Sequence, residues 1–492
     1  MIVYIRGHSF RYEMENIARL FTGEVTVSTE RPVPAGDFAY LRAACAGGRM
    51  RLLCYVSIGG DRGLLRRTAP MEDSRAQEYE LAGMLYDLLS ARFGVKPPWG
   101  ILTGIRPAKY VSSRREALGS WDAVRSELTG RCHVTGAKTE LAIATAIHSQ
   151  AVRALSRPDS VSLYISIPFC PTRCSYCSFV SKTTERDGGR QLESYVNCLV
   201  REIGQALAVI RRLGLRLETV YIGGGTPTVM TAEQLASVLE AVSAGAELAG
   251  VREFTVEAGR PDTIDREKLL LLKRAGVSRI CINPQTFSDE VLRAIGRRHT
   301  AADIDRVFAE ARALGFSNIN MDLIAGLPGD TAEGFRRSLD RVSELAPEGV
   351  TVHALTIKRA STLREKGGFT ASPASVMVDD AYRTLTENGY VPYYMYRQKG
   401  TVDNLENVGY SRPGYFGLYN VFIMDELHTI MACGAGAVTK LVDPFTHRIS
   451  RIFNYKYPAE YIDGFEEMLR RKNGVEDFYA GCVSSQAADR QP

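Results

Sequence analysis

The sequence lacks three features that would each define a class of protein. No apolar run approaches the roughly 18 residues that a helix needs to cross a bilayer, so we expect no membrane span. The first residues lack the charged-then-apolar layout of a secretory signal, which predicts a cytoplasmic protein. The 61 Lys+Arg and 56 Asp+Glu are spread without a concentrated basic patch, so we expect no nucleic-acid partner. A polyanionic small substrate is compatible with the net charge of +5.

Cysteine occurs ten times, too rarely and too scattered for the disulfide framework of a secreted protein. Only three of the ten lie together, at Cys170, Cys174 and Cys177. In a reducing compartment, clustered cysteines more often bind a metal or carry out redox chemistry than form disulfides. This cluster is therefore the first candidate for a functional site.

The length of 492 residues indicates two or three domains, at roughly 150 residues each. Residues 1–155 form the first predicted region, an α+β region of unknown role without a catalytic motif. Short alternating segments predict strands at Ile2–Ile5 and Arg51–Ser57. Apolar spacing predicts helices over about 78–93 and 140–155.

Residues 156–360 form the second predicted region, in which strand, loop and amphipathic helix alternate. The predicted strands are Ser162–Ile167, Thr219–Ile222, Glu253–Glu257, Arg279–Asn283, Asn318–Ile324 and Val350–Thr356. The predicted helices are Tyr195–Leu213, Ala232–Val242, Arg266–Ala275 and Asp303–Leu314. Such alternation implies parallel strands with right-handed crossovers. Because six units are fewer than the eight of a closed barrel, we expect an α/β fold with a partial (β/α)6 barrel.

A doubly wound sheet is the rival interpretation of the same pattern. In both folds the functional residues lie at the carboxyl ends of the strands. The third predicted region, 361–492, is a C-terminal extension on the substrate side. It begins with a helix at Val376–Asn388 and an aromatic segment at Tyr390–Tyr396. The small polar stretch from Gly481 is expected to be a loose tail.

The clustered cysteines are spaced C-x3-C-x2-C in a loop that follows an apolar strand. Three thiolates on one loop can hold three irons of a four-iron cluster and leave the fourth iron open to a ligand. Structural zinc is disfavoured because it needs four protein ligands, and no histidine or fourth cysteine lies near the loop. A disulfide would leave one cysteine over, and chance explains a lone C-x2-C more readily than this triplet. The spacing therefore predicts an iron–sulfur cluster on Cys170, Cys174 and Cys177.

A glycine-rich turn closes the second predicted strand, where Gly223, Gly224 and Gly225 precede Thr226. Glycines let the backbone approach a ligand closely and expose N–H groups to a charged one. Such a turn alone is weak evidence, because many are merely tight turns. Its place at the next strand end after the cysteine loop makes it part of the same candidate site.

Polar side chains also lie at later strand ends, where a structural role alone would favour valine or isoleucine. Glu257 closes the third strand, Gln285 follows the fourth and Asp322 lies in the fifth. The Glu257 carboxylate can accept hydrogen bonds from the hydroxyl groups of a ligand, and an ordinary strand-end salt bridge is the alternative. The guanidinium of Arg297 can fork onto a carboxylate. His299 is better explained as a surface or packing histidine.

The segment Ile167–Cys170, with Tyr164, Cys174, Tyr176 and Cys177, resembles the signature of radical S-adenosylmethionine enzymes. The residues of this segment are similar to those of the oxygen-independent coproporphyrinogen III oxidases. The resemblance implies a [4Fe–4S] cluster whose open iron is chelated by S-adenosylmethionine, and whose electron releases a 5′-deoxyadenosyl radical. It also implies that the cosubstrate is contacted by Tyr164, Tyr176, Gly223, Gly224, Gly225, Thr226, Glu257, Gln285, Arg297 and Asp322.

Two C-terminal stretches, Tyr394–Lys399 and Asn404–Tyr410, look like the Z-type branch of this family, the coproporphyrinogen dehydrogenases. Aromatic side chains there can pack against a tetrapyrrole face, while Arg397 and Lys399 can meet its propionates. A tyrosine-rich core edge explains the same residues almost as well. Both interpretations stay open at this point.

One position departs from the family pattern. The best-known decarboxylating members carry a further cysteine two residues beyond the third ligand, where this sequence has Phe179. That ending is closer to the heme-chaperone branch. We expect oxidative decarboxylation of coproporphyrinogen III to protoporphyrinogen IX, and the alternatives are a heme-binding carrier and a radical enzyme with another substrate. The implied partners are a small tetrapyrrole and an unidentified electron donor.

Overall fold

The structure, a computed structural model, describes residues 1–30, 36–104, 106–177, 179, 181–184, 189–356, 373–398 and 400–489. Its contacts divide the chain into two compact units. One comprises Met1–Ala146 with Tyr396–Leu405, and the other Ile147–Met395 with Glu406–Pro492. The three predicted regions, 1–155, 156–360 and 361–492, stay a prediction. The boundary at 360 lies outside the described residues.

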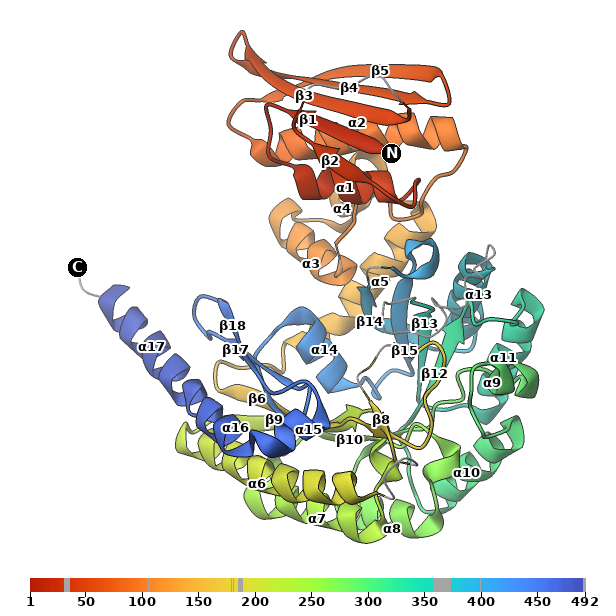
Figure 1. The fold of residues 1–492 in the computed structure, drawn as a ribbon, viewed down its shortest axis with the longest axis vertical. Helices are drawn as coiled ribbons and strands as arrows, with labels where there is room; N and C mark the ends of the chain where they lie inside the picture. The colour runs from red at the N-terminus through yellow and green to blue at the C-terminus, as the bar shows by residue number, and fades with distance from the viewer. Residues whose placement is uncertain are drawn as a thin grey trace. The chain divides into compact units, whose positions relative to one another are not determined.

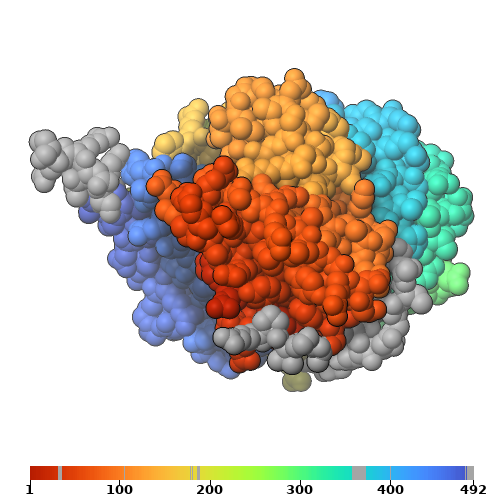
Figure 2. Space-filling view, turned by 90° about the horizontal axis from the view of Figure 1, so that it is seen from above, coloured from red at the N-terminus to blue at the C-terminus, as the bar shows by residue number. Residues whose placement is uncertain are grey.

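The first unit is built on a sheet with the strand order β2-β1-β3-β4-β5, coloured red to orange-red in Figures 1 and 2. The strands are β1 (Ile2–Arg6), β2 (Thr26–Ser28), β3 (Phe38–Ala46), β4 (Arg49–Ile58) and β5 (Asp61–Pro70). β1 pairs in parallel with β2 and β3, and β3, β4 and β5 form an antiparallel meander. The pairs Gly47-Gly48 and Gly59-Gly60 turn the two hairpins at positive φ, as two-residue type I′ turns require.

Helices complete the first unit, and two of them cover one side of its sheet (Figure 1). They are α1 (Arg11–Arg19), α2 (Ser74–Phe93), α3 (Pro107–Leu118), α4 (Trp121–Ser126) and α5 (Gly136–Arg153), and α5 continues into the second unit. Asp73 accepts a hydrogen bond from the Ala76 N–H at the start of α2, and Gly94 ends that helix in a left-handed conformation. The predicted strands and helices of this region are confirmed.

The second unit contains the six predicted parallel strands, which pair in sequence order. They are β6 (Ser160–Ile167), β9 (Arg216–Gly224), β10 (Glu253–Glu257), β11 (Arg279–Cys281), β12 (Ile319–Ala325) and β13 (Gly349–Ala354). The order never reverses within these six, which excludes the doubly wound alternative, because that topology needs a switch point. The α/β fold with a partial barrel is confirmed.

The crossover helices of this unit lie on the outer side of the curved sheet (Figure 1). They are α6 (Arg190–Arg212), α7 (Ala232–Gly245), α8 (Arg266–Arg274), α9 (Asp289–Ala294), α10 (Ala301–Ala313), α11 (Ala332–Leu345) and, after it, α13 (Ala374–Glu387). Thr231, Asp265 and Thr300 accept hydrogen bonds from the first turns of α7, α8 and α10. The predicted helices here and at Val376–Asn388 are confirmed. No helix in the described ranges has the length and apolar character of a membrane span.

The C-terminal residues extend the barrel sheet at both edges, which the sequence pattern did not predict. β15 (Glu406–Ser411) pairs antiparallel with β13, and β16 (Thr429–Cys433) pairs in parallel with β6. The other elements are β14 (Val391–Arg397), α14 (Leu418–Asp425), β17 (Val438–Val442), β18 (Ile449–Phe453), α15 (Pro458–Asp463), α16 (Phe465–Lys472) and α17 (Gly474–Asp489). The expected loose tail was wrong up to Asp489, because these residues continue α17.

Candidate metal centre and cosubstrate site

The cysteine loop begins at the carboxyl end of β6. Cys170 ends a short strand, β7 (Phe169–Cys170), which pairs with β8 (Lys182–Thr183). Cys174 is buried, whereas Cys170 and Cys177 are half-buried. The Cys177 N–H donates to the Cys174 carbonyl at 3.1 Å, which closes the loop into a tight turn. All three sulfurs therefore come from one short segment at the edge of the sheet where the strands end.

Charged and polar groups surround these sulfurs. The Thr226 hydroxyl donates to the Cys170 sulfur at 3.5 Å, and Nη1 of Arg260 donates to the Cys174 sulfur at 3.7 Å. Burial, with a smaller contribution from the neighbouring Cys170 and Cys174, raises the pKa of the Cys177 thiol to about 11. Burial likewise raises the pKa of Cys170. The charges of neighbouring cysteines contribute to the raised pKa values of Cys170 and Cys177, so the sulfurs of the loop lie within electrostatic reach of one another.

The three thiols of this loop fit the ligand set of a four-iron cluster. Within the described parts of the chain, no three His, Cys, Asp or Glu side chains gather closely enough to hold one metal ion. In a four-iron cluster each thiolate binds a different iron, so its cysteine sulfurs stand farther apart than the ligands of one ion do. Cys170, Cys174 and Cys177 would hold three of the irons, and no fourth protein ligand lies on their loop.

The glycine-rich turn at the end of β9 packs tightly against the cysteine loop. Gly225 N–H donates to the Ile167 carbonyl, and Thr226 N–H to the Phe169 carbonyl, both at 2.8 Å. A Cβ on Gly225 would lie 2.5 Å from the Phe169 carbonyl oxygen, so only glycine fits there. The glycines thus hold the turn against the segment that carries Cys170. Their contact with a bound cosubstrate stays a prediction.

Glu257 occupies the end of β10 beside this turn. The Tyr221 hydroxyl donates to Oε1 of Glu257 at 2.6 Å, and Gly224 N–H donates to Oε2 at 3.3 Å. Burial raises the pKa of Glu257 to about 7, and the charge of Asp322 adds to the rise, while the two hydrogen bonds oppose it. Glu257 forms no ion pair with any described residue, so the strand-end salt bridge is not its role.

Buried polar atoms without partners mark the next strand end. Gln285 has a positive φ of 68°, and its backbone bridges to β12 through Ile324 N–H and the Asp322 carbonyl. Its Oε1, Oδ1 of Asn283 and Nε of Arg297 are buried and lack a hydrogen-bond partner among the described residues. A bound molecule with hydroxyl and carboxylate groups would satisfy these atoms. The residues present therefore fit a polar cosubstrate.

Arg297 and Asp322 are held by neighbours rather than by each other. Nη1 of Arg297 donates to the Asn283 carbonyl at 2.8 Å, and Nη2 donates to the Tyr176 hydroxyl at 3.4 Å. Nδ2 of Asn320 donates to Asp322 at 2.8 Å, and His353 lies 3.7 Å from the same carboxylate. Burial works to raise the pKa of Asp322, but these neighbours keep it below its usual value.

Three tyrosines stack inside the barrel. Tyr164 of β6 and Tyr221 of β9 have their ring centroids 6.2 Å apart, and Tyr419 of α14 lies 4.4 Å from Tyr221. Tyr164 and Tyr221 are thereby placed near Glu257, whereas Tyr176 stays on the cysteine loop beside Arg297. A residue of the C-terminal extension thus completes the aromatic wall of the barrel interior.

The C-terminal signature forms a core edge instead of an exposed propionate site. Tyr393 and Tyr394 are buried in β14. Nη1 of Arg397 donates to the Leu102 carbonyl, and the guanidinium lies 5.4 Å from the centre of the Trp99 ring. The prediction that Arg397 meets propionates is therefore wrong, because its guanidinium is buried. Lys399 lies outside the described residues.

Two further outcomes concern residues that the sequence left ambiguous or missed. His299 is a packing histidine, since its side chain is fully buried and burial lowers its pKa to about 4. Arg260 and Tyr419 were not predicted to be part of the site. Arg260 could have been noticed, because it follows the strand end of Glu257 by three residues. No sequence signal marks Tyr419, since its partners come from much earlier in the chain.

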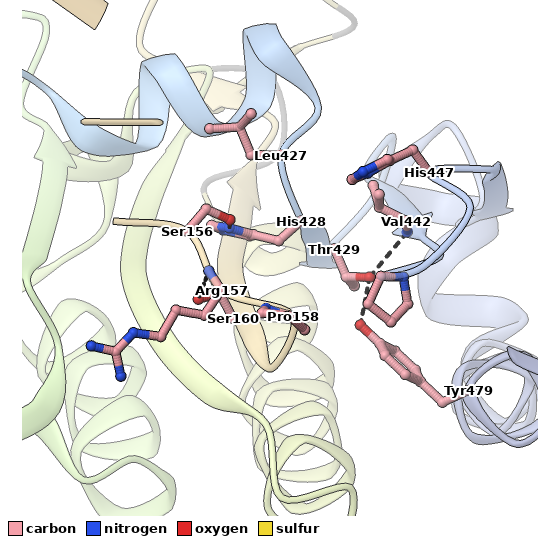
Figure 3. A pocket seen from close by; sticks show the side chains of 11 residues that line it. Ser156, Arg157, Pro158, Ser160, Leu427, His428, Thr429, Val442, His447 and Tyr479 are labelled. Carbon is pink, nitrogen blue, oxygen red and sulfur yellow. Dashed lines mark hydrogen bonds between the residues drawn. The ribbon is translucent and has the colours of Figure 1, made fainter. Parts of the chain in front are cut away.

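A cavity of about 140 Å³ lies at the opposite, amino ends of β6 and β16 (Figure 3). His428 points to Ser156 and donates or accepts a 2.8 Å hydrogen bond there, and its other ring nitrogen lies 2.9 Å from Ser162. Burial lowers the pKa of His428 to about 3. Both ring nitrogens of His428 have hydrogen-bond partners within the protein. The cavity lies at the start of β6, whereas the cysteine loop follows its end, so this cavity is not part of the cysteine site.

Comparisons with known proteins agree with this geometry. Residues 164–342 match the Radical SAM superfamily. The chain is 41% identical to the oxygen-independent coproporphyrinogen-III oxidase-like protein HemZ of Bacillus subtilis, over 78% of each chain. It is 30% identical to the heme chaperone HemW of Lactococcus lactis, over 66% of this chain and 80% of the relative.

Among solved structures, coproporphyrinogen III oxidase HemN from Escherichia coli, a radical SAM enzyme, matches with a TM-score of 0.50. That match has 23% identity and covers 66% of this chain and 73% of the other, so it shows a shared fold.

The partial barrel and its cysteine loop define a radical S-adenosylmethionine protein, which uses a [4Fe–4S] cluster and S-adenosylmethionine. Within that superfamily, the chain belongs to the family of oxygen-independent coproporphyrinogen-III oxidase-like proteins that contains HemZ.

Proposed function

We propose that this chain catalyses the oxidative decarboxylation of coproporphyrinogen III to protoporphyrinogen IX without oxygen, in heme biosynthesis. The observation that carries the proposal is the 41% identity to HemZ over 78% of each chain. A radical route suits this reaction, because an unactivated propionate carbon carries no acidic hydrogen for a side-chain base to remove.

When bound, the cluster and S-adenosylmethionine supply a 5′-deoxyadenosyl radical. In the overall change, the β-carbon of each of two propionates loses a hydrogen atom, carbon dioxide leaves, and one electron passes to an acceptor, so that a vinyl group forms. The chain's own contribution is orientation of the reactants and exclusion of water and oxygen. Water and oxygen would be excluded by the closed turn of Gly225 and by the stacked rings of Tyr164, Tyr221 and Tyr419. These groups form a closely packed surface beside Glu257.

Individual side chains supply the orientation in this proposal. Glu257 accepts hydrogen bonds from the ribose hydroxyls, and Gln285 and Asn283 accept further donors with oxygens that have no described partner. Nε of Arg297 donates to the carboxylate of the methionine portion. Asp322 stays ionised beside His353 and Asn320, because its pKa is lowered.

A second candidate, a heme chaperone, is favoured by one observation. Phe179 stands where decarboxylating relatives have a further cysteine, and its side chain is 66% exposed. The similarity to HemW supports the same candidate. In this case the chain would bind heme stoichiometrically and release no product.

One anaerobic assay separates the candidates. The reconstituted protein is incubated with coproporphyrinogen III, S-adenosylmethionine and a reductant, and tetrapyrroles and 5′-deoxyadenosine are quantified by chromatography. A parallel anaerobic sample is titrated with heme to measure the stoichiometry of binding. Protoporphyrinogen together with carbon dioxide supports the decarboxylase. Stoichiometric heme binding without product supports the chaperone and refutes the decarboxylase, and 5′-deoxyadenosine without either outcome refutes both.

A further inference from the structure

One side of the sheet in the first unit is left open by the helices. Arg67 of β5 pairs with Glu80 and Asp87 of α2, and a Cβ on Gly63 would touch Leu88 of the same helix, so these residues mark the covered side. Side chains alternate along a strand, so the intervening residues form the opposite side. We call this opposite side, on which Tyr4 and Phe38 are nevertheless buried, the open face.

The strand register assigns the residues of the open face. Cross-strand partners share a side of the sheet, which places Tyr4, Tyr40, Tyr55 and Leu64 in one row. One neighbouring row contains Arg6, Arg42, Leu53 and Arg66, and another contains Ile2, Phe38, Ser57 and Arg62. Two shorter rows contain Ala44, Arg51 and Thr68, and Ala46, Arg49 and Pro70. None of these paired positions is acidic.

The open face carries six arginines, all exposed, at Arg6, Arg42, Arg49, Arg51, Arg62 and Arg66. Their charge exceeds the net charge of +5 of the whole chain, so all other residues together are slightly acidic. Arg6 and Arg42 are direct cross-strand partners, and Arg51 is a diagonal neighbour of Arg42. Like charges at such positions repel each other, which destabilises the sheet.

None of these six guanidinium groups forms an ion pair or a side-chain hydrogen bond with a described residue. Elsewhere, exposed arginines such as Arg336, Arg341 and Arg470 pair with carboxylates on their own helices. The repulsion on the open face is therefore uncompensated within the described chain. An anionic partner would relieve it.

We propose that the open face binds single-stranded nucleic acid. Arginine forks onto phosphate with two parallel hydrogen bonds, and half-buried tyrosines such as Tyr40 and Tyr55 offer ring surfaces on which bases stack. The arginines span four strands, which suits a linear polyanion better than one compact molecule. The sequence predicted no nucleic-acid partner, because its charges are dispersed along the chain. That prediction opposes this proposal, and the same experiment tests both.

The probe is a short fluorescein-labelled oligouridylate, and its binding to the full-length protein is followed by fluorescence anisotropy at several salt concentrations. The test variants are the double substitution Arg42→Gln/Arg66→Gln and the single substitution Tyr55→Thr. The matched control is Arg337→Gln/Arg470→Gln, which removes two exposed arginines from helices of the second unit. Thermal unfolding and S-adenosylmethionine cleavage check that each variant is folded.

The double variant should lose at least roughly tenfold in affinity and flatten the slope of log K against log salt by about 1.4, as the loss of two phosphate contacts to a single strand predicts. Tyr55→Thr should weaken binding roughly fivefold or more through the loss of stacking. The control variant should bind like the unchanged protein.

Three results would overturn the proposal. The first is equal losses in the control and the open-face variants. The second is that a duplex and heparin bind as tightly as the oligouridylate and that Tyr55→Thr has no effect, which would indicate unspecific attraction of polyanions. The third is absence of oligonucleotide binding, including a case in which coproporphyrin or an acidic protein binds the face instead.

Discussion

The hydroxyl of Tyr221 donates a 2.6 Å hydrogen bond to the Glu257 carboxylate, which couples an aromatic wall of the barrel to a strand-end acid. Burial raises the pKa of that carboxyl to about 7, and the hydrogen bond opposes the rise. Glu257 therefore changes its charge near neutral pH. This relationship gives the first prediction.

S-Adenosylmethionine should bind more tightly as the pH rises from 6 to 8, because the ionised Glu257 is the better acceptor for ribose hydroxyls. Tyr221→Phe should raise the pKa of Glu257 further and weaken binding at pH 7 roughly tenfold, since a hydrogen bond to a charged group contributes about 1.5–3 kcal/mol. Isothermal titration calorimetry across this pH range measures the effect. As a control, Glu257→Gln should remove the pH dependence, and a dependence that survives would contradict the assignment.

Arg260 should tune the reduction potential of the cluster. Its guanidinium is buried, forks onto Asp262 and donates to the Cys174 sulfur. A cation and donor beside a ligand sulfur stabilise the reduced, more negative cluster. Arg260→Gln should therefore lower the midpoint potential, measured by a redox titration monitored by electron paramagnetic resonance, while iron content is retained.

Arg260→Lys serves as the comparison for that experiment, because it keeps the positive charge but loses the two parallel hydrogen bonds to Asp262. An intermediate potential is expected for it. An unchanged potential in Arg260→Gln would show that the guanidinium only supports the loop.

Replacement of Cys170, Cys174 or Cys177 by Ala should abolish the brown colour and the cleavage of S-adenosylmethionine, because each thiolate would hold one iron of the cluster. Cys198→Ala is the matched control, since this half-buried cysteine lies on α6 and should leave both properties intact. Iron analysis and 5′-deoxyadenosine formation are the measurements. A loop variant that retained both would refute the ligand assignment.

A buried ion pair should stabilise the C-terminal part of the second unit. Nζ of Lys472 lies 3.0 Å from Oε1 of Glu202, and both side chains are fully buried. The Tyr461 hydroxyl and Gly434 N–H also donate to this carboxylate. Lys472→Met should cost about 3–5 kcal/mol in urea unfolding, because it leaves the Glu202 charge without a counterion. Adding Glu202→Gln should recover part of that loss, and no recovery would argue against charge as the cause.

Much of the barrel could be predicted, because its pattern is local. Each of the strands β6, β9, β10, β11, β12 and β13 is an apolar run, and loops and amphipathic helices alternate with them along the chain. Both the type of element and the parallel pairing follow from that alternation. The same logic placed the cysteine loop, the Gly225 turn and Glu257 at the strand ends. The structure has these residues there.

Other features depend on residues far apart in the chain. β16 pairs with β6 across more than half of the sequence, and its five residues carry no signal that would reveal the partner. Arg397 looked like a free cation, yet packing against Trp99 buries it. Phe179 departs from the decarboxylase pattern in the sequence, and the fold alone does not reveal its consequence.

The sequence by itself indicated the cofactor chemistry, because the spacing of Cys170, Cys174 and Cys177 keeps the three thiols within one short loop whatever the rest of the chain does. Only the tertiary structure decided which side of the first unit's sheet its arginines share. The arginines of the open face alternate with apolar residues along β3, β4 and β5, and they meet on one side because the register of the hairpins aligns them. Pairing between strands is a property of the sheet, and no single stretch of sequence contains it.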